Sequence, residues 1–112
     1  MRFLLKAVMD TDRANTLARA GKLGSVIKEI VDEQKPEAAY FTDDHGKRTA
    51  LVILDMKEVS QIPAFAEPWF LALNAHIEFH PLMVSADLEK AVPGIEKAAK
   101  TYGQYHTVKV AA

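Results

Sequence analysis

Four segments with β-strand patterning, two of them joined by a short turn, constrain the fold of this chain most strongly. The segments are residues 2–9, 38–42, 48–56 and 75–80. The first has an apolar face opposite a mixed face, the last alternates cleanly, and the third is apolar almost throughout, as in a central strand. Turn-forming residues at Asp43–Gly46 predict a hairpin between the second and third segments.

Helical periodicity follows the first strand. Apolar residues recur at helical spacing from about residue 11 to residue 34, and Asp10 or Thr11 can cap this helix. Gly21 and Gly24 weaken the helix, so a break between two shorter helices is an open alternative.

A second amphipathic helix is predicted over about residues 60–73. Its apolar stripe comprises Ile62, Phe65, Ala66, Trp69, Phe70 and Leu73. Because Trp69 falls on this stripe, core packing is favoured over an aromatic box that contacts a ligand. Pro68 predicts a kink or a restart within the helix.

The C-terminal part is predicted to form one more helix and a tail. Ser85 can cap the helix, Pro93-Gly94 interrupts it, and Gly103 ends it. Residues 1–103 are then expected to form a single domain. Residues 104–112 form a tail that is a candidate for a strand exchanged with a second copy of the chain.

The order strand–helix–strand–strand–helix–strand is the split βαβ pattern of ferredoxin-like folds. We therefore predict an α+β fold with a four-stranded antiparallel sheet and an added C-terminal helix. Right-handed crossovers place both main helices on one face of this sheet. The other face would carry Leu4, Val8 and part of the strand 48–56, too much apolar area for a monomer to expose. A second copy that covers this face would make a homodimer.

Composition excludes several classes of protein. Charged residues make up 26% of the 112 residues and the net charge is -1, so the chain lacks the positive charge needed for nucleic acid or an anionic membrane. It has no cysteine, which excludes disulfides, thiolate nucleophiles and cysteine-ligated zinc, and fits the cytoplasm. No segment has the pattern of a signal peptide or a membrane span.

Two stretches, KPEAAYFT (Lys35–Thr42) and AEPWFLALNAHIEFHPLMVSADL (Ala66–Leu88), carry a resemblance to a known group. With the order of the elements, they make the chain similar to small bacterial proteins of the dimeric α/β-barrel superfamily. In that superfamily two ferredoxin-like sheets pack face to face into one barrel, often with exchanged C-terminal segments. Members include muconolactone isomerases, cofactor-independent monooxygenases and heme-handling enzymes. The resemblance covers about residues 1–102 and implies a dimeric barrel. It does not assign a catalytic role to any residue of this chain, and the chain has no motif for heme binding.

His76, Glu78 and His80 are the most suggestive group of polar residues. Alternation puts the three side chains on one face of the last strand, with neighbouring Cα atoms about 6.5 Å apart. Such a trio can bind a ligand and transfer protons, or hold zinc or iron. Alternatively, it forms a polar strand surface in which Glu78 pairs with Lys6 or Arg2 of the first strand.

The functional prediction is a small-molecule-binding protein or a cofactor-free enzyme, with its pocket in or beside the dimeric barrel. We expect His76, Glu78 and His80 to be catalytic, Lys6 and Tyr40 to contact a small organic ligand, and no metal or other cofactor to take part. Whether the chain is an enzyme at all stays open. The alternative is a non-enzymatic dimerisation module. Neither nucleic acid nor a membrane is expected as a partner.

Overall fold

Four strands form one sheet in the order β2-β3-β1-β4. The structure, a computed structural model, describes residues 1–107. Its strands are β1 (Arg2–Val8), β2 (Ala38–Asp44), β3 (Lys47–Asp55) and β4 (His76–Pro81). Every neighbouring pair is antiparallel. The predicted α+β fold with a four-stranded antiparallel sheet is therefore confirmed, and the strand order is compatible with a ferredoxin-like fold.

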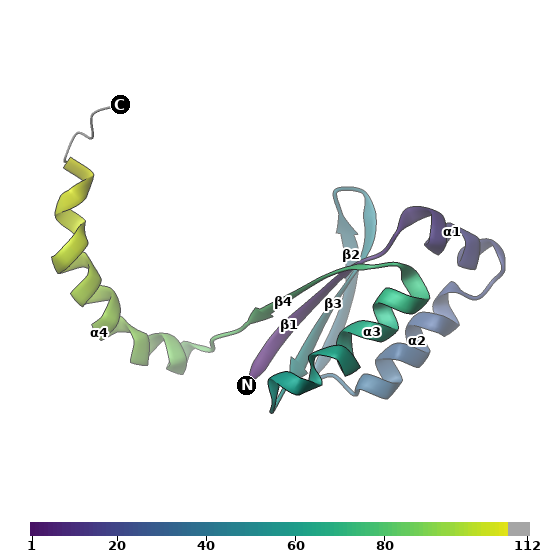
Figure 1. The fold of residues 1–112 in the computed structure, drawn as a ribbon, viewed down its shortest axis with the longest axis horizontal. Helices are drawn as coiled ribbons and strands as arrows, with labels where there is room; N and C mark the ends of the chain where they lie inside the picture. The colour runs from purple at the N-terminus through teal and green to yellow at the C-terminus, as the bar shows by residue number, and fades with distance from the viewer. Residues whose placement is uncertain (108–112) are drawn as a thin grey trace. The chain divides into compact units, whose positions relative to one another are not determined.

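Three helices lie on one side of this sheet (Figure 1): α1 (Thr11–Arg19), α2 (Leu23–Gln34) and α3 (Ile62–Leu73). A short 3₁₀ helix, Val59–Gln61, leads into α3. The chain groups into two compact units, residues 1–82 and residues 83–112. The second unit contains α4 (Ser85–Tyr102) and a 3₁₀ helix over Gly103–Thr107. None of the helices described in residues 1–107 has both the length and the apolar character needed to cross a membrane.

The first helical region is divided into α1 and α2. The side chain of Asp10 caps α1 by accepting a hydrogen bond from the backbone N–H of Arg13 (2.9 Å). Gly21 follows α1 with a φ of +71°, a left-handed conformation that glycine adopts without strain. The break therefore lies at Gly21, whereas Gly24 is part of α2.

The hairpin between β2 and β3 turns through two residues with positive φ. His45 has a φ of 51° and Gly46 a φ of 78°, as in the turns that match the twist of paired strands. This tight turn lets β2 continue to Asp44, two residues beyond the predicted strand end at Thr42.

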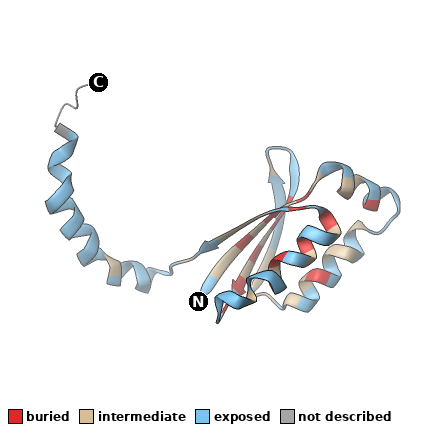
Figure 2. Cartoon of the chain, in the orientation of Figure 1, coloured by how far each residue is buried: buried red, intermediate tan, exposed pale blue. Residues whose placement is uncertain are grey.

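The core lies between the sheet and α1–α3. It contains alternate residues of the central strands and the inner faces of the helices (Figure 2), among them Leu5, Ala7, Leu17, Ile30, Val52, Leu54, Trp69 and Leu73. Trp69 has no exposed surface, which confirms its predicted place in the core. Ile62 and Phe70, in contrast, are 36% and 42% exposed, so their predicted burial is wrong. Ile62 is the first residue of α3, and Phe70 lies on the flank of the stripe.

The orientation of β4 agrees with the predicted alternation. Ile77 and Phe79 pack against the core, which leaves the intervening side chains on the opposite face. Pairing also continues past the predicted end of this strand. Pro81 lies opposite Phe3, and the N–H of Leu82 donates to the carbonyl of Arg2 (2.9 Å).

Both helices continue past their internal prolines, so the predicted interruption of α4 and a restart at Pro68 are wrong, whereas a kink at Pro68 stays a prediction. Pro68 lies inside α3 and Pro93 inside α4, since a helix can continue past a proline at the loss of one backbone hydrogen bond. Ser85 is the first residue of α4 rather than its cap, and the carboxylate of Asp87 accepts the N–H of Val84 instead (3.1 Å).

Within the described part of the tail, residues Gly103–Thr107 form a 3₁₀ helix. The strand exchanged with a second copy, for which residues 104–112 are a candidate, stays a prediction. The rest of the tail, residues 108–112, lies outside the described residues. The single domain expected over residues 1–103 stays a prediction.

Candidate functional site

One face of the sheet carries all five predicted site residues. No helix of residues 1–82 lies on the side opposite α1–α3 (Figure 1), and we call this side the open face. The pairing register brings to it Leu4, Lys6 and Val8 of β1, Ala38, Tyr40, Thr42 and Asp44 of β2, Thr49, Leu51 and Ile53 of β3, and His76, Glu78 and His80 of β4. Apolar side chains predominate on β3 and β1, and ionisable ones on β4.

Lys6 lies in the middle of the open face. It is paired with Leu51 on one side and with Glu78 on the other. Its Nζ lies 2.7 Å from Oδ2 of Asp44 and 4.0 Å from Oε2 of Glu78. The single ammonium group therefore links carboxylates from the two edge strands, β2 and β4.

A histidine stands beside each of these carboxylates. Nε2 of His80 lies 3.2 Å from Oε1 of Glu78, and Nδ1 of His45 lies 2.9 Å from Oδ1 of Asp44. Together with Lys6, these four residues form a row of ionisable groups across the open face, which we call the ionic chain. It runs in the order His45, Asp44, Lys6, Glu78, His80, so that basic and acidic side chains alternate.

Lys6 and Asp44, the closest pair in the ionic chain, hold each other in the charged form. Its hydrogen bond to Asp44 raises the pKa of Lys6 above the ordinary value, although partial burial works in the other direction. The same hydrogen bond lowers the pKa of Asp44. Both side chains are about a quarter to a third exposed. The site therefore presents a permanent cation close to a permanent anion at neutral pH.

A broad hollow adjoins the ionic chain. Its volume is about 360 Å³, and its lining includes Leu4, Lys6, Thr42, Asp44, Leu51 and His80. This volume lies within the range of small-molecule pockets, and the lining combines apolar walls with a few polar groups, as such pockets do. The hollow opens onto the open face.

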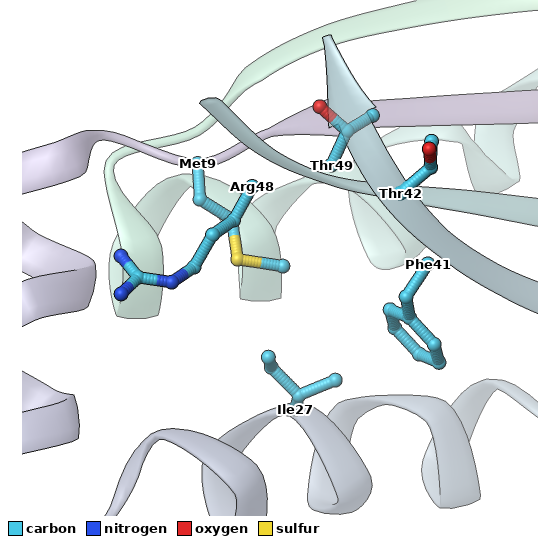
Figure 3. A pocket seen from close by; sticks show the side chains of 6 residues that line it. All are labelled: Met9, Ile27, Phe41, Thr42, Arg48 and Thr49. Atoms are coloured by element: carbon cyan, nitrogen blue, oxygen red, sulfur yellow. The ribbon is translucent and has the colours of Figure 1, made fainter. Parts of the chain in front are cut away.

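A second hollow lies at the other side of β2, between this edge strand and α2 (Figure 3). Its volume is about 340 Å³, and Phe41 and Ile27 face it together with Met9. The one charged side chain in its lining, Arg48, donates to Oδ1 of Asn15 (2.9 Å). Its lining contains no pair of acidic and basic side chains, so this hollow is a weaker candidate for a functional site than the open face.

The structure brings together three of the five predicted site residues. Lys6, Glu78 and His80 are within one ionic chain. His76 shares their face but lies opposite Val8, and it makes no hydrogen bond or ion pair with the described residues. Tyr40 lies on the same face, opposite Leu51, and its side chain is 60% exposed.

Sequence reasoning missed Asp44, which it assigned to a solvated turn. Because β2 extends to residue 44, Asp44 has the same orientation as Tyr40 and Thr42 and reaches Lys6. Continuing the alternation of the strand from Ala38 through the turn residues would have placed it on this face. The predicted partner Arg2 binds Glu37 instead, with Nε 2.9 Å from Oε2.

No three His, Asp or Glu side chains within residues 1–107 are arranged to hold a metal ion together. That the protein functions without a metal or other cofactor stays a prediction. What the ionic chain offers is proton transfer and charge stabilisation: a histidine held by a carboxylate, next to a charged ammonium group.

Comparisons with known proteins found no matching family model, no matching curated protein and no matching solved structure.

Proposed function

We propose that this chain is a ferredoxin-like protein that binds a small organic ligand on its open face, as a homodimer. The observation that carries the proposal is the hollow of about 360 Å³ beside Lys6 and His80, on a face where β1 and β3 carry mainly apolar side chains and which no helix of residues 1–82 covers. A ligand there would meet apolar side chains such as Leu4 and Leu51 as well as the ionic chain.

Proton transfer is the chemistry that this site supports best. When Nε2 of His80 donates to Glu78, Nδ1 of the same ring is left as a proton acceptor. The ammonium group of Lys6 can stabilise negative charge that develops on an oxygen of the ligand. This pairing suits a cofactor-free reaction in which a proton is removed from a carbon next to a carbonyl group.

The homodimer follows from the cost of exposing the open face. Leu4, Val8, Leu51 and Ile53 are only partly buried on it, and Tyr40 projects from it. A second copy would remove these side chains from water and would close the hollow. This is the arrangement of the dimeric α/β-barrel superfamily, which the chain resembles in the order of its elements.

A ligand screen with site variants tests the proposal. Small aromatic compounds and lactones are titrated against the protein and followed by calorimetry and by amide chemical shifts. We expect at least one compound to bind with shifts centred on β1 and β4. Lys6→Met and His80→Asn should weaken its binding by about tenfold or more, which is about 1.4 kcal/mol each.

A matched control separates the site from the rest of the sheet surface. Glu37→Gln, like Glu78→Gln, removes a carboxylate that pairs with a basic side chain. The partner of Glu37 is Arg2, which does not line the hollow, whereas the partners of Glu78, Lys6 and His80, do line it. Glu78→Gln should weaken ligand binding, whereas Glu37→Gln should not, and both should melt within a few degrees of the parent chain. Equal binding by all variants, or loss of folding in Lys6→Met and His80→Asn, would overturn the site assignment.

A dimerisation module without a ligand is the second candidate function. It is favoured by the apolar side chains on the open face, which account for an interface by themselves. Under this reading the screen gives no specific ligand while the protein remains a dimer.

A further inference from the structure

The edge strand β2 is left uncovered on the side of the sheet that faces α1–α3. Ala39, Phe41 and Asp43 point to this side, because they alternate with the residues of the open face. Phe41 is nevertheless 56% exposed, and the core contains no residue of β2. Phenylalanine in such a position is normally buried. An apolar surface therefore remains uncovered between β2 and the nearest helix, α2.

Two adjoining hollows occupy this gap. The first, of about 340 Å³, is the one into which Phe41 of β2 and Ile27 of α2 point from two sides (Figure 3). The second has a volume of about 270 Å³ and is lined by Gly24, Ile27, Lys28, Val31, Asp32 and Phe41. Because Ile27 and Phe41 line both hollows, the two form one groove, which we call the β2–α2 groove. Its size is that of a small-molecule site.

One end of the β2–α2 groove carries a cation without an acidic partner. Nη1 of Arg48 donates to Oδ1 of Asn15, and Arg48 makes no ion pair with the described residues. Asp43 lies opposite Arg48 in the pairing of β2 with β3, but its carboxylate accepts the N–H of Gly46 in the hairpin turn (3.2 Å). A guanidinium group has five N–H donors, so Arg48 keeps donors for a bidentate bond to an anion.

The rest of the groove offers apolar surface and no further unmatched charge. Lys28 and Asp32, which line the second hollow, form an ion pair with each other one turn apart on α2. The hydroxyl of Thr49 donates to the carbonyl of Lys47 (3.0 Å). A ligand that complements the groove therefore has an apolar body and a single negative charge at one end.

We propose that the β2–α2 groove binds a monocarboxylate with an apolar chain, of the class of medium-chain fatty acids. The carboxylate accepts two hydrogen bonds from Arg48, and the chain covers Phe41 and Ile27. Because these two side chains border two hollows in succession, a slender chain suits the groove better than a compact ring system. This site depends neither on the homodimer nor on the ligand proposed for the open face.

Titration with octanoate and with octanol, followed by chemical shifts of the labelled protein, tests this inference. The two compounds share one chain and differ in the carboxylate, and octanoate is kept below the concentration at which it forms micelles. We expect octanoate to move the resonances of Phe41 and Ile27 and to bind at least about tenfold more tightly than octanol, which is about 1.4 kcal/mol. Leu4 and His80, which line only the hollow of the open face, should not move.

Two arginine variants of equal net charge separate the site from general electrostatics. Arg48→Met should weaken octanoate binding by about tenfold or more and leave octanol binding within about twofold. Arg19→Met removes an exposed arginine at the end of α1, outside the groove, and should change neither affinity by more than about twofold. Arg48→Lys keeps the charge but loses the bidentate geometry, so its affinity for octanoate should fall between those of the parent chain and Arg48→Met. Phe41→Ala should weaken the binding of both compounds.

Each other outcome overturns the inference in a recognisable way. Equal affinity for octanoate and octanol in the parent chain would show that Arg48 does not hold a carboxylate. Shifts centred on Lys6 and His80 would place octanoate on the open face, which supports the site proposed there but removes this one. Shifts of Phe41 that follow the protein concentration rather than octanoate would assign the groove to a second copy. No shift at millimolar octanoate would exclude this ligand class from the groove and leave the proposal for the open face intact.

Discussion

Nζ of Lys6 lies 2.7 Å from Oδ2 of Asp44, although β3 runs between the strands that carry these two residues. The long lysine side chain reaches diagonally across the small side chain of Thr49, which is opposite both Val8 and Thr42. The pair therefore ties β1 to the edge strand β2 on the open face.

The stability contributed by this pair should depend on pH at both ends of the scale. Because the folded-state pKa of Asp44 is lowered, its contribution is complete above the ordinary carboxyl pKa and is lost as pH falls through the folded value. Because the folded-state pKa of Lys6 is raised, its contribution is complete below the ordinary lysine pKa and is lost as pH rises through the folded value.

Urea unfolding of the parent chain and of Lys6→Met between acid and alkaline pH measures this effect. The difference in the free energy of unfolding should be constant between about pH 5 and about pH 9 and should shrink beyond those limits. Asp44→Asn should show the same profile, and the double variant should lose little more than either single one. A difference that does not change with pH would show that Lys6 acts through its methylene groups alone.

Replacement of the only tryptophan should be severely destabilising. Trp69 is fully buried, and its Nε1 donates to Oε1 of Gln34 (3.3 Å). Trp69→Ala should lower the free energy of unfolding by about 3–5 kcal/mol, as other large-to-small core substitutions do. Circular dichroism during urea unfolding measures this change without using tryptophan fluorescence. Near-native stability of Trp69→Ala would mean that α3 does not pack on the sheet through this side chain.

The strands and their orientation were predictable because alternation is a strong local signal. Ile77 and Phe79 can face the core only if Glu78 faces away, and a slip by one residue would bury three polar side chains. The pairing of Glu78 with Lys6 followed from the neighbouring positions of β1 and β4, and it is present at 4.0 Å. These parts of the fold could be predicted without knowledge of tertiary contacts.

Element ends and helix continuity were not predictable in the same way. Asp43 and Asp44 have turn chemistry, yet the turn itself needs only His45 and Gly46, and the two aspartates belong to β2. Pro68 has a strong tendency to break a helix, but packing of α3 on the sheet outweighs that tendency. In both cases a tertiary interaction decides against a local preference.

Two glycines should respond to alanine in opposite directions. Gly46 has a φ of +78°, so Gly46→Ala forces a left-handed conformation and should cost about 1–2 kcal/mol. Gly24 lies in the first turn of α2 with ordinary helical geometry, and a methyl group there meets no atom within 4 Å. Gly24→Ala should stabilise the protein by up to about 1 kcal/mol. Thermal and urea unfolding of both variants, measured together, tests this contrast; a stabilising Gly46→Ala would mean that the hairpin turn is of another type.

The mass of the protein in solution tests the central claim that a second copy covers the open face. Sedimentation equilibrium at micromolar concentration should give about twice the 12.4 kDa of one chain. Leu51→Glu, which places a charge in the middle of the open face, should shift the equilibrium toward the monomer, whereas Lys28→Glu on the outer side of α2 should not. A stable species of 12.4 kDa for the parent chain at that concentration would contradict the account.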